Sequence, residues 1–235
     1  MNIVITGASK GLGKAIAEAF AEDKQGHSFF LCARNKEELD KAAKELQGRF
    51  PRINMYSKVC DVGEKNSVIT FANWIMQQTD RIDILINNAG VFYPGSVNNE
   101  EDGVLEKMIQ VNLFGAYQLT RFLLPGMMKM KAGHIFNICS IASLQAYENG
   151  GAYSISKFAL YGFSKNLREE MKPYGIKVTH VLPGAAYTDS WGSSDIDPKR
   201  IMEADDIAKM IYTAAHLSPQ ACVEEIILRP LLGDL

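Results

Sequence analysis

Cysteine and histidine are scarce in this chain of 235 residues, and neither forms a metal-binding pattern. The four cysteines contain no CxxC pair, and three fall in or beside predicted strands, so we expect reduced thiols in a cytoplasmic protein. The four histidines lack the spacing of metal ligands, which indicates structural roles. These residues are Cys32, Cys60, Cys139 and Cys222, and His27, His134, His180 and His216. We therefore predict no metal site.

Long runs of one charge or of apolar residues are also missing. The net charge is −2 and no long basic run occurs, which argues against a nucleic-acid partner. No apolar run approaches the roughly 18 residues that cross a bilayer, and Met1 to Thr6 is too short for the hydrophobic part of a signal peptide. We expect no membrane association. The composition, 47% hydrophobic and 22% charged, suffices for an ordinary core.

What the chain does contain is a regular alternation of short apolar runs and helical patterns. Strands are predicted at 3–5, 28–33, 53–60, 82–86, 134–139, 177–182 and 222–229. Helices are predicted at 14–22, 35–48, 64–78, 101–130, from Tyr153 to about 171, and at 203–217. This order favours the α/β class: one domain over 1–235 with a doubly wound, Rossmann-type parallel sheet of about seven strands and helices on both faces.

A glycine-rich turn, Gly7-Ala-Ser-Lys-Gly11-Leu-Gly13, joins the first strand to the first helix. Glycines allow a close approach of the backbone to a phosphate, and a helix N-terminus offers unpaired N–H groups. The spacing matches neither GxGxxG nor a P-loop. Two other readings remain: a purely structural turn, or a GxSxG hydrolase elbow with Ser9 as its nucleophile.

The end of the second strand bears on cofactor choice. NAD-selective sites usually place an acid there to hold the ribose 2′-hydroxyl, but positions 30–33 read Phe-Leu-Cys-Ala. Arg34 follows, and Lys10 lies in the glycine turn. Two cations suit a 2′-phosphate, so NADP(H) is the predicted cofactor. The alternative is that both are solvated surface cations.

Tyr153 and Lys157 are four residues apart and share one helix face. An ammonium one turn away would lower the phenol pKa from about 10 toward about 7, which makes the tyrosine a usable acid or base. Ser140 follows the strand at 134–139, where open α/β sheets keep their sites. Taken alone, Tyr153 and Lys157 could equally be an ordinary pair on a surface helix.

Two further features are irregular for their positions. Asn112 stands in the middle of a long helical pattern, where asparagine is unfavourable, so it either serves the function or makes a core hydrogen bond. The polar segment 185–203 is long for a connection and follows the carboxyl end of a strand. It is a predicted substrate lid, with Trp191 as a predicted substrate contact.

Together these motifs resemble the short-chain dehydrogenase/reductase family over essentially the whole chain. They are TGASKGLG at 6–13, Asp61, NNAG at 87–90, Asn112, Ser140, YSISK at 153–157 and PG at 183–184 with Thr188. The resemblance implies that Ser140 holds the substrate carbonyl, Tyr153 protonates it, and Lys157 binds the nicotinamide ribose and lowers the Tyr153 pKa. It also implies that Asn112 holds a water in a proton path.

The implied catalytic residues are Asn112, Ser140, Tyr153 and Lys157, and the implied substrate contacts are Ser140, Tyr153 and Trp191. The implied cofactor-binding residues are Gly7, Ser9, Lys10, Gly11, Leu12, Gly13, Arg34, Asn35, Asp61, Val62, Asn88, Ala89, Gly90, Tyr153, Lys157, Pro183, Gly184 and Thr188.

A narrower resemblance concerns substrate choice. PGAAYTDSWG at 183–192 and VEEIILRP at 223–230 resemble bacterial sepiapterin reductases. The function expected is NADPH-dependent reduction of a carbonyl to an alcohol, on a sepiapterin-type substrate or, alternatively, on a 3-oxoacyl thioester or another small carbonyl compound. A non-catalytic NADP-binding redox sensor is the alternative outside the enzymes. Family members are usually homodimers or homotetramers, which is also the expectation here.

Overall fold

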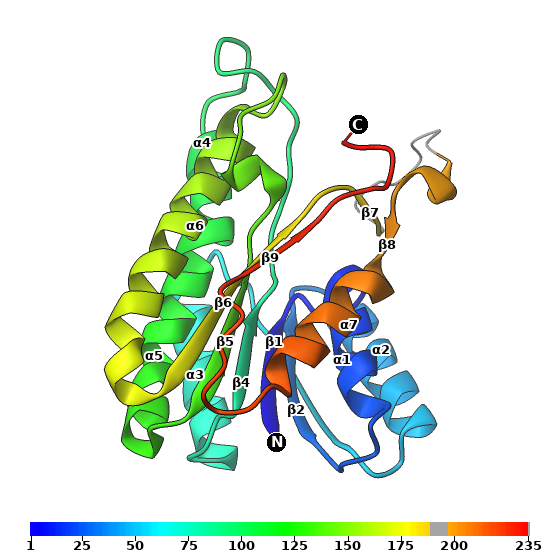
Figure 1. Cartoon of the computed structure of the whole chain (residues 1–235), viewed down its shortest axis with the longest axis vertical. Coiled ribbons are helices and arrows are strands. Elements are labelled where there is room, and N and C mark those ends of the chain that lie inside the picture. The colour runs from blue at the N-terminus through cyan, green and yellow to red at the C-terminus, as the bar shows by residue number, and fades with distance from the viewer. Residues whose placement is uncertain (189–196, 235) are drawn as a thin grey trace.

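The structure is a computed structural model that describes residues 1–188 and 197–234. Its centre is a seven-stranded sheet in the order β3-β2-β1-β4-β5-β6-β9, with every neighbouring pair parallel (Figure 1). The strands are β1 (Asn2–Thr6), β2 (Ser28–Ala33), β3 (Asn54–Val59), β4 (Ile84–Asn87), β5 (Gly133–Ile138), β6 (Ile176–Pro183) and β9 (Glu225–Leu228). The predicted doubly wound parallel sheet is confirmed.

Helices cover both faces of this sheet (Figure 1). They are α1 (Gly11–Ala21), α2 (Lys36–Arg49), α3 (Lys65–Gln78), α4 (Val104–Ile109), α5 (Gly115–Met130), α6 (Gly151–Met171) and α7 (Ala204–Ala215). Side chains alternate between the faces of a strand. In β1, Ile3 and Ile5 accordingly enter one hydrophobic cluster and Val4 enters the other. Both faces are buried, which explains why the strands read as continuous apolar runs.

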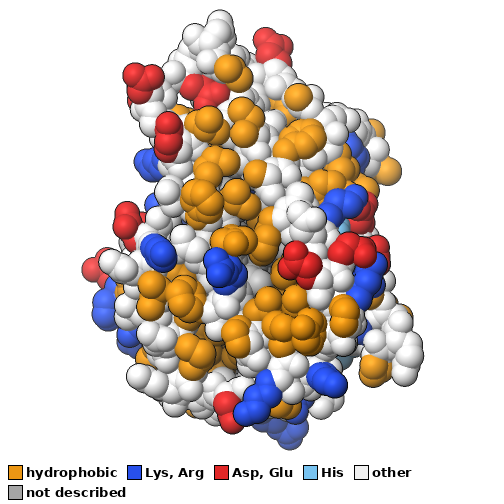
Figure 2. Space-filling model, turned by 90° about the vertical axis from the view of Figure 1, so that its left-hand side faces the viewer, with side chains coloured by type: hydrophobic (Ala, Val, Ile, Leu, Met, Phe, Trp, Pro, Cys, Tyr) orange, Lys and Arg blue, Asp and Glu red, His pale blue; other side chains and the backbone are white. Residues whose placement is uncertain are grey.

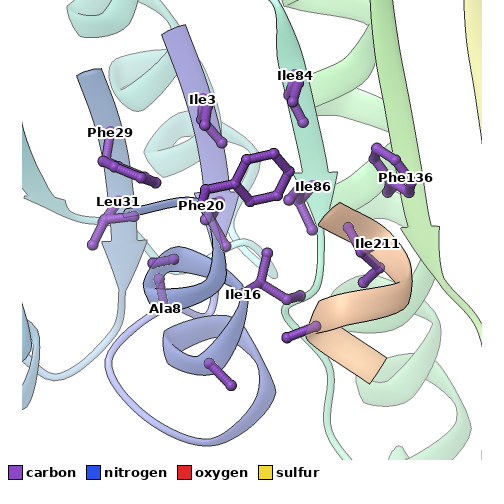
Figure 3. Close-up of a cluster of buried hydrophobic side chains, with 14 of the residues drawn as sticks. Ile3, Ala8, Ile16, Phe20, Phe29, Leu31, Ile84, Ile86, Phe136 and Ile211 are labelled. Carbon is purple, nitrogen blue, oxygen red and sulfur yellow. The ribbon is translucent and has the colours of Figure 1, made fainter. Parts of the chain in front are cut away.

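The first cluster joins α1 and α7 to the middle of the sheet. Phe20 of α1 and Ile211 of α7 are fully buried and face β1, β4 and β5, as Figure 3 shows. The second cluster lies beneath α3, α5 and α6 and contains Phe71 and Leu119. Burying a large apolar side chain contributes about 2–3 kcal/mol, so these two layers hold the strand ends in fixed positions.

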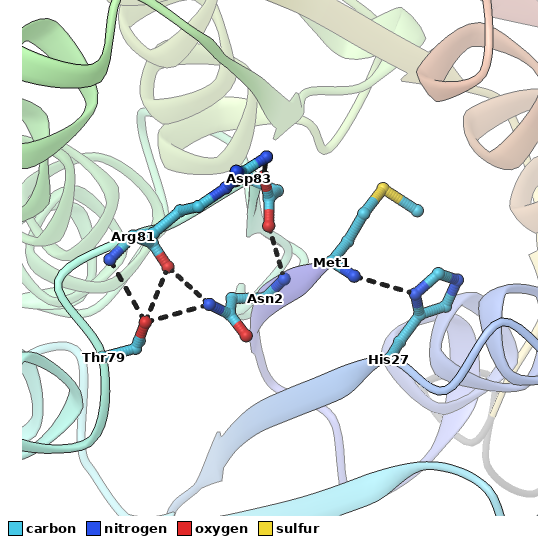
Figure 4. A network of polar contacts seen from close by, with 6 residues as sticks. All are labelled: Met1, Asn2, His27, Thr79, Arg81 and Asp83. Carbon is cyan, nitrogen blue, oxygen red and sulfur yellow. Dashed lines mark hydrogen bonds and ion pairs between the residues drawn. The ribbon is translucent and has the colours of Figure 1, made fainter.

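A polar network closes the amino-terminal edge of the sheet (Figure 4). The Asn2 backbone N–H donates to Asp83 Oδ2 at 2.7 Å, and the Asn2 side chain donates to Thr79 Oγ1 and to the Arg81 carbonyl. The Met1 amino group lies 3.1 Å from His27 Nδ1. These contacts tie β1 to its neighbours at the edge opposite to the candidate site.

The predicted helix at 101–130 is wrong in one respect. The chain forms α4, then a π-helical turn (Gln110–Phe114), then α5. The extra residue of a π turn lets Asn112 point inward, where it is 1% exposed. In α2, Asn35 is the N-cap and accepts from the Glu38 backbone N–H, and the helix continues past Gly48, where it was predicted to end, to Arg49.

The site-forming end of the sheet lies where the strand order reverses. From β1 the chain continues to β2, whereas β4, the other neighbour of β1, leads to β5. Crossovers on either side of such a point leave a crevice at the carboxyl ends of the strands. Nearby, the short strands β7 (Ala186–Tyr187) and β8 (Met202–Glu203) pair in parallel. Among the described residues, no helix is long and apolar enough to cross a membrane.

Candidate active site

A cleft of about 350 Å³ opens at this crevice. Its walls come from the glycine turn, from the loops after β2, β3 and β4, and from the start of the predicted lid. The lining residues are Gly7, Ser9, Lys10, Gly11, Leu12, Ala33, Arg34, Asn35, Glu38, Cys60, Asp61, Val62, Asn88, Ala89, Gly90, Val91, Val111 and Thr188. Most of the residues predicted for cofactor binding are therefore gathered in one place.

Gly13 is not part of the wall, because it packs behind the glycine turn. A Cβ at this position would lie 2.3 Å from the Gly7 carbonyl oxygen and 2.6 Å from Asn88 Nδ2. Gly7 itself has φ +65°, a conformation that side chains disfavour. Glycine at these two positions lets α1 approach β1 closely and points the N-terminus of α1 into the cleft.

The loop after β4 is fastened to the end of β1. Asn88 Nδ2 donates to the carbonyl oxygens of Thr6 and Gly7 at 2.9 and 3.1 Å, and the Thr6 hydroxyl accepts from the backbone N–H groups of Asn88 and Ala89. Asn87 Nδ2 donates to Asn137 Oδ1, which joins β4 to β5. The asparagines of the NNAG motif therefore tie neighbouring strands together.

Positive charge gathers at the far end of the cleft, where β2 ends. Arg34 and Lys10 both line it, and Lys10 Nζ lies 3.6 Å from Glu38 Oε1. Glu38 was not predicted as a site residue. The sequence indicates its role only through its position: Glu38 is the third residue of α2, so its side chain can reach the residues just before the helix.

Tyr153, Ser140 and Phe92 meet beside the cleft. The hydroxyl of Ser140 hydrogen-bonds to Tyr153, and the Phe92 ring stands edge-on to the phenol ring at a centroid distance of 4.9 Å. Ser140 caps a short helical turn, Ile141–Ser143, by accepting from the Ala142 backbone N–H. This cap fixes the position of the serine oxygen at the end of β5. Phe92 was missed in the sequence, because an aromatic residue in a loop carries no distinctive pattern.

Lys157 lies one turn after Tyr153 on α6 and is buried. Its side chain contacts the end of β5 and the loop after β4. Its Nζ donates to the Ile138 carbonyl at 2.8 Å and lies 5.8 Å from the Tyr153 ring centroid. A Cβ on Gly90, which lines the cleft, would lie 3.6 Å from this nitrogen. The ammonium therefore lies near both the phenol ring and the cleft wall at Gly90, but Lys157, Tyr153 and Ser140 are not among the residues that line the cleft.

The pKa of Tyr153 differs from the sequence expectation. Burial raises the pKa of this phenol above its ordinary value, and the hydrogen bond from Ser140 offsets only part of that increase. Burial also lowers the pKa of Lys157 from 10.5 to about 8. Desolvation is thus the largest cause of both shifts. The lowering of the phenol pKa that the spacing predicted is not found in this structure.

The side chain of Asn112 makes three hydrogen bonds. Its Oδ1 accepts from the Val91 N–H at 2.8 Å, while Nδ2 donates to the Val91 carbonyl at 3.0 Å and to Ser156 Oγ at 2.9 Å. These bonds hold the cleft wall against the helix that carries Tyr153. Of the two readings of Asn112, the core hydrogen bond is therefore present, and it serves to position the site.

Comparison with known proteins shows the family to which this chain is related. The model of the short chain dehydrogenase family matches residues 1–199. The chain belongs to this family. It is 32% identical over 239 residues to a sepiapterin reductase of Chlorobaculum tepidum, covering 99% of this chain and 97% of the relative.

Solved structures agree. One similar structure is a metagenomic short-chain oxidoreductase in complex with NADP (31% identity, TM-score 0.85). Another is an alcohol dehydrogenase from the archaeon Thermococcus sibiricus complexed with 5-hydroxy-NADP (28% identity, TM-score 0.90). Each comparison covers 98% of this chain and 96% of the other. The present chain is thus a short-chain dehydrogenase, an oxidoreductase.

The cleft of this short-chain dehydrogenase fits a dinucleotide. The N-terminus of α1 carries no side-chain cap from the described residues, so its backbone N–H groups are available to a pyrophosphate. The Asp61 carboxylate also lines the cleft, and its Oδ1 accepts from the Gly63 N–H. Residues missed in the sequence, Ala33, Cys60, Val91 and Val111, supply an apolar surface.

The predicted lid is only partly described. Its two ends are joined, because β7 pairs with β8 and the Met202 N–H donates to the Ala185 carbonyl. Thr188 lies beside Gly11, with its Cβ 3.4 Å from where a Cβ on that glycine would be. Pro183 and Gly184 end β6, and Gly184 is packed against Pro230 and Asp234. Trp191 lies outside the described residues.

Proposed function

We propose that this chain is an NADPH-dependent reductase that converts a carbonyl group to an alcohol, with Tyr153 as the general acid. The observation that carries the proposal is the contact of Tyr153 with Ser140, with Lys157 Nζ 5.8 Å from the phenol ring and next to Gly90, which lines the cleft. Bound NADPH would supply a hydride to the carbonyl carbon.

The protein's own groups act on the carbonyl oxygen. Negative charge builds on this oxygen as the hydride arrives, and two hydroxyl donors held in place stabilise it, each worth on the order of 3 kcal/mol. Ser140 donates a hydrogen bond, and Tyr153 transfers its proton. The raised pKa of Tyr153 keeps that proton in place until the much more basic alkoxide forms. The ammonium of Lys157 then stabilises the resulting phenolate.

Replacement of the acid tests this role. Tyr153→Phe keeps the ring against Phe92 and removes only the hydroxyl, so NADPH should still bind while turnover falls by at least about 10³-fold. Tyr161→Phe, two helical turns further along α6, is the matched control and should stay active. An active Tyr153→Phe enzyme would exclude the proposed acid. A protein that binds NADPH but oxidises it with no carbonyl compound would favour the redox-sensor alternative.

The NADP preference is supported by Arg34 and Lys10 at the end of the cleft. Arg34→Ala should weaken binding of NADPH about tenfold or more and leave NADH nearly unchanged, because an arginine–phosphate contact is charge-assisted. Titration of both cofactors by fluorescence measures this difference. Equal weakening for both would show that Arg34 does not contact the 2′-phosphate.

For the substrate we propose a sepiapterin-type carbonyl compound with a planar ring, with 3-oxoacyl thioesters and other small carbonyl compounds as alternatives. The proposal is supported by the similarity to a sepiapterin reductase and by the aromatic side chains around the acid. Phe92 and Tyr147 are 46% and 45% exposed, and both lie beside Tyr153. NADPH oxidation with sepiapterin, acetoacetyl thioesters, diketones and aldehydes would rank these classes.

We also propose a homodimer or homotetramer. Figure 2 shows hydrophobic side chains along the side of the molecule formed by α4, α5 and α6. Exposed members there include Phe114 and Tyr117, next to or on α5, and Ile155 and Phe158 on α6. Apolar groups on two adjacent helices suit a second copy of the same surface.

A further inference from the structure

The carboxylate of Glu38 lies in the part of the cleft where the 2′-phosphate of NADP(H) is proposed to bind. Glu38 lines the cleft together with Lys10 and Arg34, and its Oε1 lies 3.6 Å from Lys10 Nζ. Its side chain is 45% exposed, and that of Lys10 is 55% exposed, so both ends of the pair are in contact with solvent. Both side chains can therefore change position, and an anion that approaches Lys10 and Arg34 also meets the Glu38 carboxylate.

The position of Glu38 is fixed by its backbone. Its N–H donates to Asn35 Oδ1 at 3.1 Å, which caps the first turn of α2. The cap does not use the carboxylate. The side chain is therefore not needed to begin the helix, and a neutral glutamine at the same place would preserve the local fold.

We propose that Glu38 is a specificity-determining residue that competes with the 2′-phosphate of NADP(H) for Lys10 and so limits the preference for NADP(H) over NAD(H). A phosphate that binds Lys10 must either displace the carboxylate or accept its repulsion. A ribose with a free 2′-hydroxyl carries no charge at this point and escapes this cost. This inference rests on the proposed binding of the 2′-phosphate by Lys10 and Arg34.

Glu37 provides a matched control. It is the preceding residue, carries the same charge at the same helix end, and is exposed, but it does not line the cleft. Changing either residue to glutamine alters the net charge and the helix terminus equally. Only Glu38→Gln removes a charge from the phosphate end of the cleft, so a difference between the two variants reports the local contact.

The experiment measures Kd for NADPH, NADH, 2′,5′-ADP and 5′-AMP with the intact wild-type chain, Glu38→Gln and Glu37→Gln. Exposed ion pairs have modest energies, so Glu38→Gln should bind NADPH and 2′,5′-ADP about fivefold more tightly, with NADH and 5′-AMP changed by less than about twofold. The gain should shrink in 0.5 M salt, because exposed charges are screened. Glu37→Gln should match the wild type.

Two outcomes would overturn the inference. Unchanged or weaker NADPH binding by Glu38→Gln would show that the carboxylate does not oppose the phosphate. Weaker NADH and 5′-AMP binding would show that it instead accepts a hydrogen bond from the nucleoside. Arg34→Ala separates this from the proposed function: if that variant loses no more affinity for NADPH than for NADH, the assignment of the 2′-phosphate to Arg34 and Lys10 fails, whatever Glu38→Gln does.

Discussion

Replacing Lys157 by methionine is expected to stabilise the cofactor-free protein at neutral pH while abolishing turnover. The lysine is 5% exposed, and burial lowers its pKa from 10.5 to about 8. That difference corresponds to about 3 kcal/mol of disfavoured charge in the folded state. Methionine fills a similar volume without a charge. It loses the hydrogen bond to the Ile138 carbonyl, at a cost of about 1–2 kcal/mol, so a net gain of about 1–2 kcal/mol remains.

The pH dependence gives a stricter test of the same idea. The folded pKa of Lys157 lies below the unfolded one, so between pH 8 and 10.5 the unfolded chain binds more protons. The penalty is therefore complete below about pH 8 and is relieved as the pH rises toward 10.5. The wild-type lysine should gain stability relative to methionine over this range, and the advantage of methionine should disappear by about pH 10.

Urea unfolding at pH 7 and pH 10 measures both effects. Both proteins should carry Tyr153→Phe, so that the neighbouring phenol does not titrate in the same range. Lys41→Met, at an exposed position on α2, is the control and should show no such pH-dependent difference. A methionine variant that is less stable at pH 7 by the same amount as at pH 10 would show that burial of the ammonium carries no cost.

Three further predictions concern stability and assembly. Burial lowers the pKa of His134 to about 3, so the unfolded chain binds more protons between pH 6.5 and pH 3. The free energy of unfolding should therefore fall by up to about 1.4 kcal/mol per pH unit as the pH drops through this range. Urea unfolding at pH 7 and pH 5 should show a smaller fall for His134→Gln than for the wild type. Gly13→Ala should destabilise the fold by at least about 2 kcal/mol because its Cβ meets backbone, whereas Gly48→Ala has open space and should stabilise it by up to about 1 kcal/mol; equal melting temperatures would contradict this. Phe158→Glu should reduce the mass found by light scattering to that of a monomer, and an unchanged mass would exclude the α6 surface as the interface.

The strands were predictable because both faces of this sheet are buried. The run at 28–33 is apolar at nearly every position, and the observed strand has the same bounds. The last strand was less accurate: the prediction began at Cys222, whereas β9 begins at Glu225. An edge strand pairs on one side only, and side chains such as Ile227 remain half exposed, so its ends leave a weaker pattern.

The π-helical turn was not predictable from periodicity. Its residues, Gln110–Phe114, continue the apolar spacing of the flanking helices, so a window average registers one long helix. The turn is stabilised by a contact that is remote in sequence, because Asn112 must reach the loop at Val91 and Ser156 on α6. Asparagine is unfavourable inside a helix, so its presence indicated an irregularity at this position. Only the tertiary structure shows which groups form hydrogen bonds with it.

The pKa of Tyr153 depends on the surroundings of the side chain and not only on the motif to which it belongs. The spacing of Tyr153 and Lys157 fixes their shared helix face, and from that alone the ammonium should lower the phenol pKa. Spacing contains no information about solvent, and here α6 is pressed against β5 with Lys157 bonded to Ile138. Burial therefore acts on both groups and favours the neutral phenol, the form that a reductase requires before hydride transfer. The spacing therefore identified the two groups and their shared helix face, but it could not give the direction of the shift in the phenol pKa.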